Sequence, residues 1–254
     1  MRLAITRAVS PALARCELTH LSREIIDVGR AAAQHAEYER ALEALGIEVG
    51  RLAADPGLPD SVFVEDTCVV VDELAIITRP GAESRRPETA AVAEAVARDR
   101  ALRHIEPPGT LDGGDVLRIG RTLFVGRSLR TNDEGIEQLR RILEPLDYQV
   151  HAVALHGCLH LKSAVTQVGP RTILVNPAWI DMDAFAGYEQ IEVDPAEPFA
   201  ANALLIGDRV IHPAGYSRTR ARLESRGVGV VSVDVSELAK AEGGVTCCSV
   251  LFED

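Results

Sequence analysis

Short apolar runs separated by glycine-marked turns recur along the chain and predict paired β-strands. The glycines lie at Gly120, Gly169 and Gly207, each between two runs rich in Val, Ile and Leu. The predicted pairs are 68–71 with 74–78, 115–119 with 123–126, 163–168 with 172–175, and 203–206 with 210–212. The pattern therefore predicts several β-hairpins in succession.

A helical pattern follows most of these pairs, and a further strand follows the helix. Residues 87–98 have Ala91, Ala95 and Val92, Val96 at i,i+4 spacing after Pro87, which is typical of an amphipathic helix. Further helices are predicted at 132–143 and 217–225, and closing strands at 104–106, 148–153 and 229–233.

The hairpin–helix–strand pattern therefore repeats at about 40 to 50 residues, a spacing typical of propellers. The strand at 249–252 has no partner near it in sequence, but the N-terminal strand at 1–7 and a helix at 30–45 complete a fifth unit. Five units joined end to end close a ring and protect the strand edges. We predict a closed ring of five α/β units that forms one domain over residues 1–254, rather than an α/β domain whose elements alternate by chance.

Composition and charge exclude several classes of function. Hydrophobic residues make up 46% of the 254 residues, which is enough for a sizeable core, whereas aromatic residues make up only 4%. Acidic residues outnumber basic ones by 38 to 27, giving a net charge of −11. This charge repels nucleic acid and attracts a small cation, so we expect a small-molecule partner.

Cysteine usage and the lack of targeting signals predict a cytoplasmic protein. No apolar run approaches the roughly 20 residues that span a bilayer, and the N-terminus does not resemble a signal peptide. The cysteines are odd in number, which favours reduced thiols; they are Cys16, Cys68, Cys158, Cys247 and Cys248. We expect no membrane partner, and the pattern is compatible with a homodimer.

Reactive residue types precede the first strand of each predicted unit. They are Asp66, Asp112, His160, Asn202 and Cys247. Equivalent positions of a closed ring converge on its axis, so these side chains are expected to meet in one pocket. A thiolate is a strong nucleophile, a histidine transfers protons near neutral pH, and two carboxylates bind a planar cation such as a guanidinium.

Other interpretations compete with this one. His156, Cys158 and His160 alternate as zinc ligands on one face of a strand do, although no fourth ligand is evident. Cys247 and Cys248 fit a buried core equally well when taken alone. The glycine pairs at 113–114 and 243–244 resemble phosphate-binding loops, but neither precedes a clear helix, so tight turns are favoured.

Four segments resemble the signature segments of the dimethylarginine dimethylaminohydrolase family. They are Asp60–Asp66, Leu111–Asp115, Leu159–Ser163 and Thr246–Ser249. The likeness runs from about Leu18 to the C-terminus. This family belongs to the pentein superfamily, together with arginine deiminases and amidinotransferases, and the resemblance implies the superfamily's five-bladed α/β-propeller.

The resemblance implies a role for each matching residue. Cys247 corresponds to the nucleophile, His160 to the general acid/base, and Asp112 to a carboxylate that orients the histidine and the substrate. The implied substrate-binding residues are Asp66 on the guanidinium, Asp60 and Glu65 around the substrate, Arg85 and Arg130 on the α-carboxylate, Leu18 in a lid, and Ala241. The implied reaction converts Nω-methylated L-arginine to L-citrulline and dimethylamine or methylamine, without metal or cofactor.

Two departures bear on this interpretation. Deiminases and amidinotransferases usually carry an aspartate at the position of Lys162. Without that acceptor, the site favours a substrate whose guanidinium nitrogen carries methyl groups and therefore forms fewer hydrogen bonds. Asp112 replaces the glutamate of some bacterial members, which affects rate more than reaction type. A deiminase or amidinotransferase acting on arginine, agmatine or another guanidine is the alternative, and a catalytically silent binding propeller is a third.

Overall fold

The computed structural model describes residues 2–253 and contains five three-stranded sheets. In every sheet the first strand of the unit is antiparallel to the second, which is parallel to the third. The strands of the first three units are β3 (Cys68–Val70), β4 (Leu74–Ile77), β5 (Ala101–His104), β6 (Val116–Ile119), β7 (Thr122–Arg127), β8 (Gln149–Ala154), β9 (Val165–Gly169), β10 (Thr172–Val175) and β11 (Glu189–Glu192). The remaining strands are β12 (Leu204–Ile206), β13 (Arg209–Pro213), β14 (Gly229–Val233), β15 (Val250–Glu253), β1 (Arg2–Arg7) and β2 (Glu48–Leu52).

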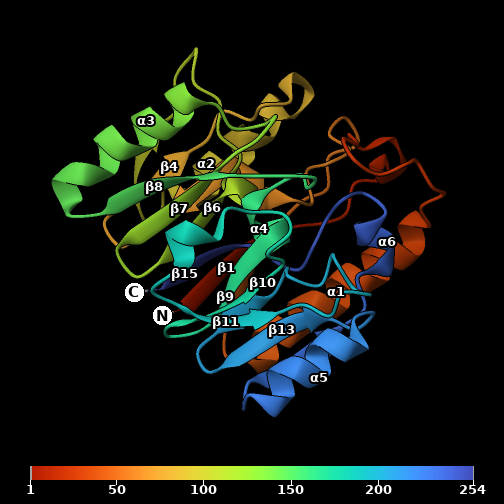
Figure 1. Ribbon diagram of the computed structural model, residues 1–254. Coiled ribbons are helices and arrows are strands. Elements are labelled where there is room, and N and C mark those ends of the chain that lie inside the picture. The colour runs from red at the N-terminus through yellow and green to blue at the C-terminus, as the bar shows by residue number, and fades with distance from the viewer. Residues whose placement is uncertain (1, 254) are drawn as a thin grey trace.

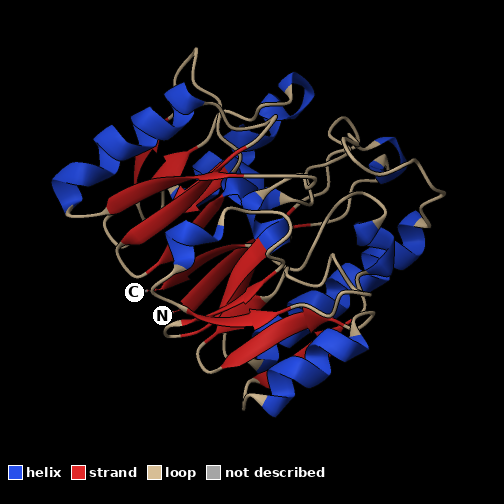
Figure 2. Cartoon of the chain, viewed as in Figure 1, coloured by secondary structure: helices blue, strands red, loops and turns tan. Residues whose placement is uncertain are grey.

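Helices connect the second and third strands of four units and lie around the outside of the sheets (Figures 1 and 2). These are α1 (Val28–Ala44), α2 (Thr89–Val96), α3 (Asp133–Leu143) and α5 (Ser217–Ser225). The unit of β9–β11 instead has a short 3-10 helix, Met182–Phe185. Two short helices, α4 (Leu161–Ala164) and α6 (Ser236–Ala239), lie outside the repeated pattern.

The amphipathic sequence of α3 explains how a helix attaches to its sheet. Ile136, Leu139 and Leu143 are buried at i,i+3 and i,i+4 spacing, and they join a core cluster with residues of β6, β7 and β8. The side chain of Asn132 caps the helix by accepting a hydrogen bond from the backbone N–H of Gly135.

The two ends of the chain close the ring. β15 pairs antiparallel with β1, so the C-terminal strand completes the N-terminal sheet, and the two ends lie together in Figure 1. Inside this joint the hydroxyls of Tyr38 on α1 and Ser249 are 2.7 Å apart and buried. The first strands of neighbouring units also meet, with β15 against β3 and β9 against both β6 and β12. The ring of five units predicted from the repeat is confirmed, and so is the five-bladed α/β-propeller that the resemblance implies.

Several predicted elements are confirmed and others need correction. The helix at 217–225 and the strand at 229–233 have the predicted bounds. The helix predicted at 87–98 is shorter, because a 3-10 helix occupies Glu83–Glu88. The strand predicted from residue 163 begins at Val165, after the helical turn α4, and strand β11 was not predicted. No helix within residues 2–253 is long and apolar enough to cross a membrane.

Candidate active site

The axis of the ring brings together the residues that precede each first strand. Asp66 lies in a 3-10 turn before β3, Asp112 precedes a similar turn before β6, and His160 is the N-cap residue of α4 before β9. Ligand-type atoms of these three side chains all lie within 4.8 Å of one another. Cys247, from the loop before β15, lines the same chamber as Asp66 and His160.

His160 is a buried cation held between carboxylates. Its Nε2 lies 3.1 Å from Oδ2 of Asp112, and its Nδ1 lies 3.9 Å from Oδ1 of Asp66. Burial opposes the charged imidazole, but the carboxylates of Asp66, Asp115 and Asp112 outweigh it and raise the pKa of His160 to about 9. The imidazole is therefore protonated at neutral pH and can supply a proton.

Asp115 also belongs to this cluster, although from the sequence we predicted it only as the first residue of a strand. Its side chain is fully buried, accepting a hydrogen bond from the backbone N–H of Leu161 at 3.0 Å and from the Ser128 hydroxyl at 2.6 Å. Burial raises the pKa of Asp115 to about 6, opposed by the charge of His160. Asp115 thus fixes the backbone of Leu161, the residue that follows His160. The only sequence signal for this role was the place of Asp115 at the end of the Leu111–Asp115 segment.

Asp66 is a carboxylate held ionised in the chamber wall. Burial raises its pKa, but His160 and Arg85 dominate and lower the pKa of Asp66 to about 2. Nη1 of Arg85 donates to Oδ2 of Asp66 at 2.6 Å, and the backbone N–H of Gly114 donates to Oδ1 at 2.9 Å. A permanent negative charge beside a small chamber suits a cationic ligand.

The guanidinium groups of Arg85 and Arg130 differ in their hydrogen-bond partners. Nε and Nη2 of Arg85 donate to Glu88, and Nη2 also donates to the Phe63 carbonyl, so Arg85 is fixed below Asp66. In Arg130, Nη2 donates to the hydroxyl of Thr19 at 2.9 Å, whereas Nη1 is buried and has no hydrogen-bond partner among residues 2–253. A buried guanidinium nitrogen without a hydrogen-bond partner is costly, so Arg130 is a candidate for binding an anion.

Cys247 is a protonated thiol in the free protein. Burial, followed by the charges of Glu65 and Asp66, raises its pKa to about 12. Its sulfur accepts a hydrogen bond from the backbone N–H of Gly244 at 3.2 Å. Asn202 holds the same loop, because its amide bonds both the hydroxyl and the backbone N–H of Thr246. Cys248 is buried, and its thiol faces the Gly244 carbonyl.

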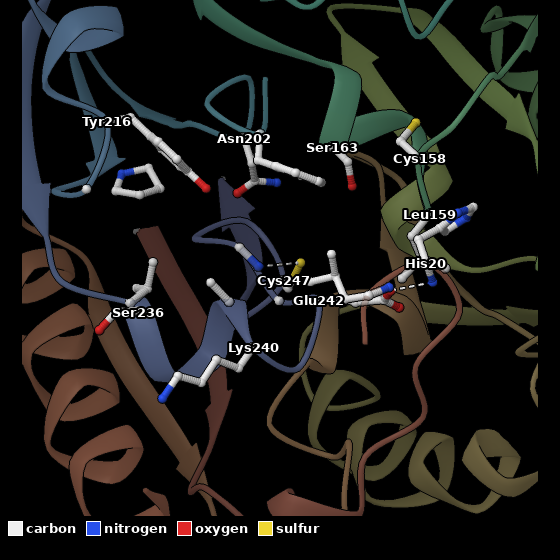
Figure 3. Close-up of a pocket in the computed structure, with 18 of the residues that line it drawn as sticks. His20, Cys158, Leu159, Ser163, Asn202, Tyr216, Ser236, Lys240, Glu242 and Cys247 are labelled. Atoms are coloured by element: carbon white, nitrogen blue, oxygen red, sulfur yellow. Dashed lines mark hydrogen bonds between the residues drawn. The ribbon is translucent and has the colours of Figure 1, made fainter. Parts of the chain in front are cut away.

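Two cavities meet at the cysteine. The chamber with His160 and Asp66 has a volume of only about 20 Å³, and a neighbouring cavity of about 360 Å³ reaches Cys247 from its other side. Leu159, Glu242, Gly243 and Cys247 line both. Figure 3 shows the sulfur facing the open part of this larger cavity, between Asn202 and Glu242.

Glu65 faces a different cavity. Nζ of Lys162 lies 2.5 Å from Oε1 of Glu65, and the hydroxyl of Thr246 donates to Oε2 at 2.8 Å. Glu65, Lys162 and Thr246 line a separate cavity of about 510 Å³ and do not line the chamber with His160. Lys162 therefore pairs with Glu65 and offsets its charge, away from the chamber that contains His160.

The other predicted residues fall into two groups. Asp60 and Ala241 line the chamber, and both carboxylate oxygens of Asp60 accept from the backbone N–H of Glu17. Leu18 does not line the chamber; it packs on the hydrophobic cluster that contains Ala241, and Glu17 of the same segment lines the chamber instead.

The zinc site considered from the sequence does not fit the structure. His156 and Cys158 do not join His160 in a metal-ligand cluster, since within residues 2–253 the one group of this kind is Asp66, Asp112 and His160. Gly113 and Gly114 lie in the 3-10 turn Gly113–Asp115, in line with the tight turn favoured from the sequence. A Cβ at Gly114 would lie 2.7 Å from both Asp66 Oδ1 and His160 Nδ1, so that glycine permits close approach.

The fold and the convergence of a cysteine, a histidine and carboxylates at its axis define the class. The structure superposes with a TM-score of 0.85 on the N-terminal domain of ArgZ, an arginine dihydrolase from cyanobacteria, covering 99% of this chain and 98% of that chain at 17% identity. This likeness shows the fold alone. The protein therefore has the pentein fold, a ring of five repeated α/β units.

Sequence comparison identifies the family. The model described as N,N dimethylarginine dimethylhydrolase, eukaryotic, matches residues 15–194. The N(G),N(G)-dimethylarginine dimethylaminohydrolase of Streptomyces coelicolor is 46% identical over 254 residues, covering 99% of this chain and 97% of that protein. A structure of the Pseudomonas aeruginosa enzyme complexed with citrulline has a TM-score of 0.94 and 37% identity, covering 98% of each chain. The chain belongs to the dimethylarginine dimethylaminohydrolase family.

The close approach at Gly114 gives a direct test of the cluster. In Gly114→Ala the new methyl group would displace His160 or Asp66, so kcat with methylated arginine should fall about a hundredfold. The control is Gly215→Ala, because a Cβ there meets nothing within 4 Å. Circular dichroism should show both variants folded. Equal activity in the two variants would contradict the proposed packing of the cluster.

Proposed function

We propose that this protein hydrolyses Nω-methylated L-arginine to L-citrulline and dimethylamine or methylamine, through a thiouronium intermediate on Cys247. The observation that supports it best is the chamber itself, where a permanent anion, a protonated histidine and a cysteine meet in a member of this enzyme family. No cofactor is required, because the substrate's positive carbon and the sulfur supply electrophile and nucleophile.

Charge complementarity supports a pose for the substrate. The guanidinium pairs with the Asp66 carboxylate, and the α-carboxylate pairs with the unpaired Nη1 of Arg130. The α-ammonium group suits the carboxylate of Asp60, whose only hydrogen-bond donor among the described residues 2–253 is the backbone N–H of Glu17. Arg85 contributes by orienting Asp66 and by adding positive charge near the α-carboxylate.

The chemistry then follows from the protonation states. Because the thiol of Cys247 has a pKa of about 12 in the free protein, it needs the substrate cation beside it to ionise, releasing its proton to solvent. The thiolate bonds to the guanidinium carbon. His160 gives its proton to the methylated nitrogen, the C–N bond breaks, and the neutral amine leaves a thiouronium.

Water completes the reaction. The now neutral His160 removes a proton from a water molecule as its oxygen bonds to the thiouronium carbon. The carbon–sulfur bond breaks and the hydroxyl proton passes to the departing sulfur, so the thiol of Cys247 is restored and neutral citrulline is released. Asp112 holds the imidazole on Nε2 throughout, so it acts as a positioning carboxylate.

Relatives bear on the choice between guanidines. A solved adduct of a dimethylarginine dimethylaminohydrolase with S-methyl-L-thiocitrulline, at 37% identity, supports attack at the amidino carbon of a substituted substrate. An arginine deiminase or amidinotransferase is the alternative. The single catalytic domain, the homodimer and the cytoplasmic location remain predictions. Light scattering would test the homodimer.

The substrate assignment predicts a clear difference between two arginines. Purified protein incubated with asymmetric dimethylarginine should form citrulline and dimethylamine, with kcat/KM at least about a hundredfold above that for arginine. Cys247→Ser should form neither product, because its hydroxyl is a far weaker nucleophile. Turnover of arginine alone would contradict the substrate assignment, and turnover by Cys247→Ser would contradict the mechanism.

The high pKa of the thiol predicts that cationic reagents label Cys247 selectively. At pH 7 the cation 2-chloroacetamidine should label it at least about tenfold faster, relative to free cysteine, than neutral 2-chloroacetamide does. The rate with the neutral reagent should rise steadily up to pH 10, since the thiolate fraction is still growing below a pKa of about 12. Intact-mass spectrometry, with Cys247→Ser as blank, measures both rates. A neutral-reagent rate that levels off below pH 8 would contradict this protonation state.

A further inference from the structure

Glu242 binds a neighbouring chain segment through its carboxylate. Oε2 accepts the backbone N–H of Thr19 at 2.9 Å, and Oε1 accepts those of His20 and Leu21 at 2.6 and 2.7 Å. Figure 3 shows the bond between Glu242 and His20 at the edge of the cavity. We name residues 17–21 the lid segment. Three consecutive N–H groups on one carboxylate form a charge-assisted clamp.

The backbone at Glu242 is adapted to this contact. Its φ is 59°, and within residues 2–253 only Asp147 shares a positive φ among residues other than glycine. A glutamate rarely adopts this conformation, which is unfavourable without compensation. The hydrogen bonds to the lid segment supply that compensation.

The other contacts of the lid segment use groups that the proposed function assigns to substrate. Asp60 accepts the N–H of Glu17, and Arg130 donates to the Thr19 hydroxyl. A bound amino acid would compete for both groups, weakening their hold on the segment. The proposed substrate pose assigns no group to Glu242, so its three bonds to the lid segment remain available when the chamber is full.

The chamber cannot admit substrate with the lid segment in this place. Its volume of about 20 Å³ is close to the space for a single water molecule. Glu17 forms part of the wall, together with Asp60 and Glu242. Entry of an arginine derivative therefore requires the bonds to Glu242 to break, and they can form again once the substrate is inside.

Glu242 is also linked through the chain to the nucleophile. Gly243 and Gly244 follow it directly, and the backbone N–H of Gly244 donates to the Cys247 sulfur at 3.2 Å. This hydrogen bond favours the thiolate. A change in the backbone position of Glu242 therefore also shifts the Gly244 N–H that donates to the Cys247 sulfur.

We propose that Glu242 is a positioning residue that latches the lid segment over bound substrate and, by doing so, fixes the Gly244 N–H on the Cys247 sulfur. The proposal rests on the proposed function and adds a step to it, because closure and preparation of the nucleophile become one event. It also explains why an acidic side chain occupies a backbone position that favours glycine.

The experiment compares Glu242→Gly with the parent protein and with Glu242→Asp. Glycine removes the carboxylate but suits the positive φ, so the backbone is not strained. With asymmetric dimethylarginine, kcat should fall and KM rise, lowering kcat/KM about a hundredfold. Glu242→Asp should recover part of this loss. Labelling of Cys247 by 2-chloroacetamidine, which needs no lid, should fall less than threefold, since only the Gly244 contact is loosened.

The matched control is Glu24→Gln. Glu24 lines the same larger cavity as Glu242, and makes no hydrogen bond or ion pair within residues 2–253, so the variant removes an equal charge without touching the latch. Its kinetics should equal those of the parent. Hydrogen exchange should show faster exchange at residues 19–21 in Glu242→Gly only.

Two results would overturn the latch. One is unchanged kcat/KM and unchanged exchange in Glu242→Gly. The other is an equal loss of turnover and of labelling in Glu242→Gly, which would indicate general damage to the site. Failure of the proposed function is distinguishable, because the parent protein would then form no citrulline while the exchange and labelling comparisons could still be made.

Discussion

One buried imidazolium among carboxylates is the interaction on which the site depends. His160 is surrounded by Asp66, Asp112 and Asp115, and all four side chains are buried. Burying this many charges is unfavourable unless each has a partner, so the arrangement persists only where several chain segments hold it rigidly. The closed ring provides this, because each of the segments before β3, β6 and β9 supplies one or two members.

The same charges explain why the nucleophile stays inactive without a ligand. Asp66 and Glu65 disfavour a thiolate at Cys247, whereas a cation bound to Asp66 would reverse that effect. We therefore expect Cys247 to react faster when a cation is bound beside Asp66 than in the free protein. The proposed substrate pose adds a second condition, because in that pose the substrate replaces the contacts of the lid segment with Asp60 and Arg130.

Much of the ring followed from the sequence because its signals are local. Gly120, Gly169 and Gly207 mark hairpin turns, and the apolar spacing of 217–225 specifies a helix within a single segment. The convergence of Asp66, His160 and Cys247 also followed, since a closed repeat brings equivalent positions to the axis. The helical turn after His160 was not predicted, because its sequence is typical of a strand. A hydrogen bond from the backbone N–H of Leu161 to the distant Asp115 stabilises the turn instead. The partners of Glu65 and Glu242 depend likewise on contacts between remote segments, which no local pattern encodes.

The protonation state of His160 is the most direct test, because proton transfer and the charge balance of the chamber both require an imidazolium. Nuclear magnetic resonance of protein labelled with ¹⁵N-histidine, with His160→Gln to assign the signal, would follow both ring nitrogens from pH 5 to pH 10. The expected result is a protonated ring at pH 7 that titrates near the pKa of about 9. A ring that is already neutral at pH 7 would contradict the central role given to this buried cation.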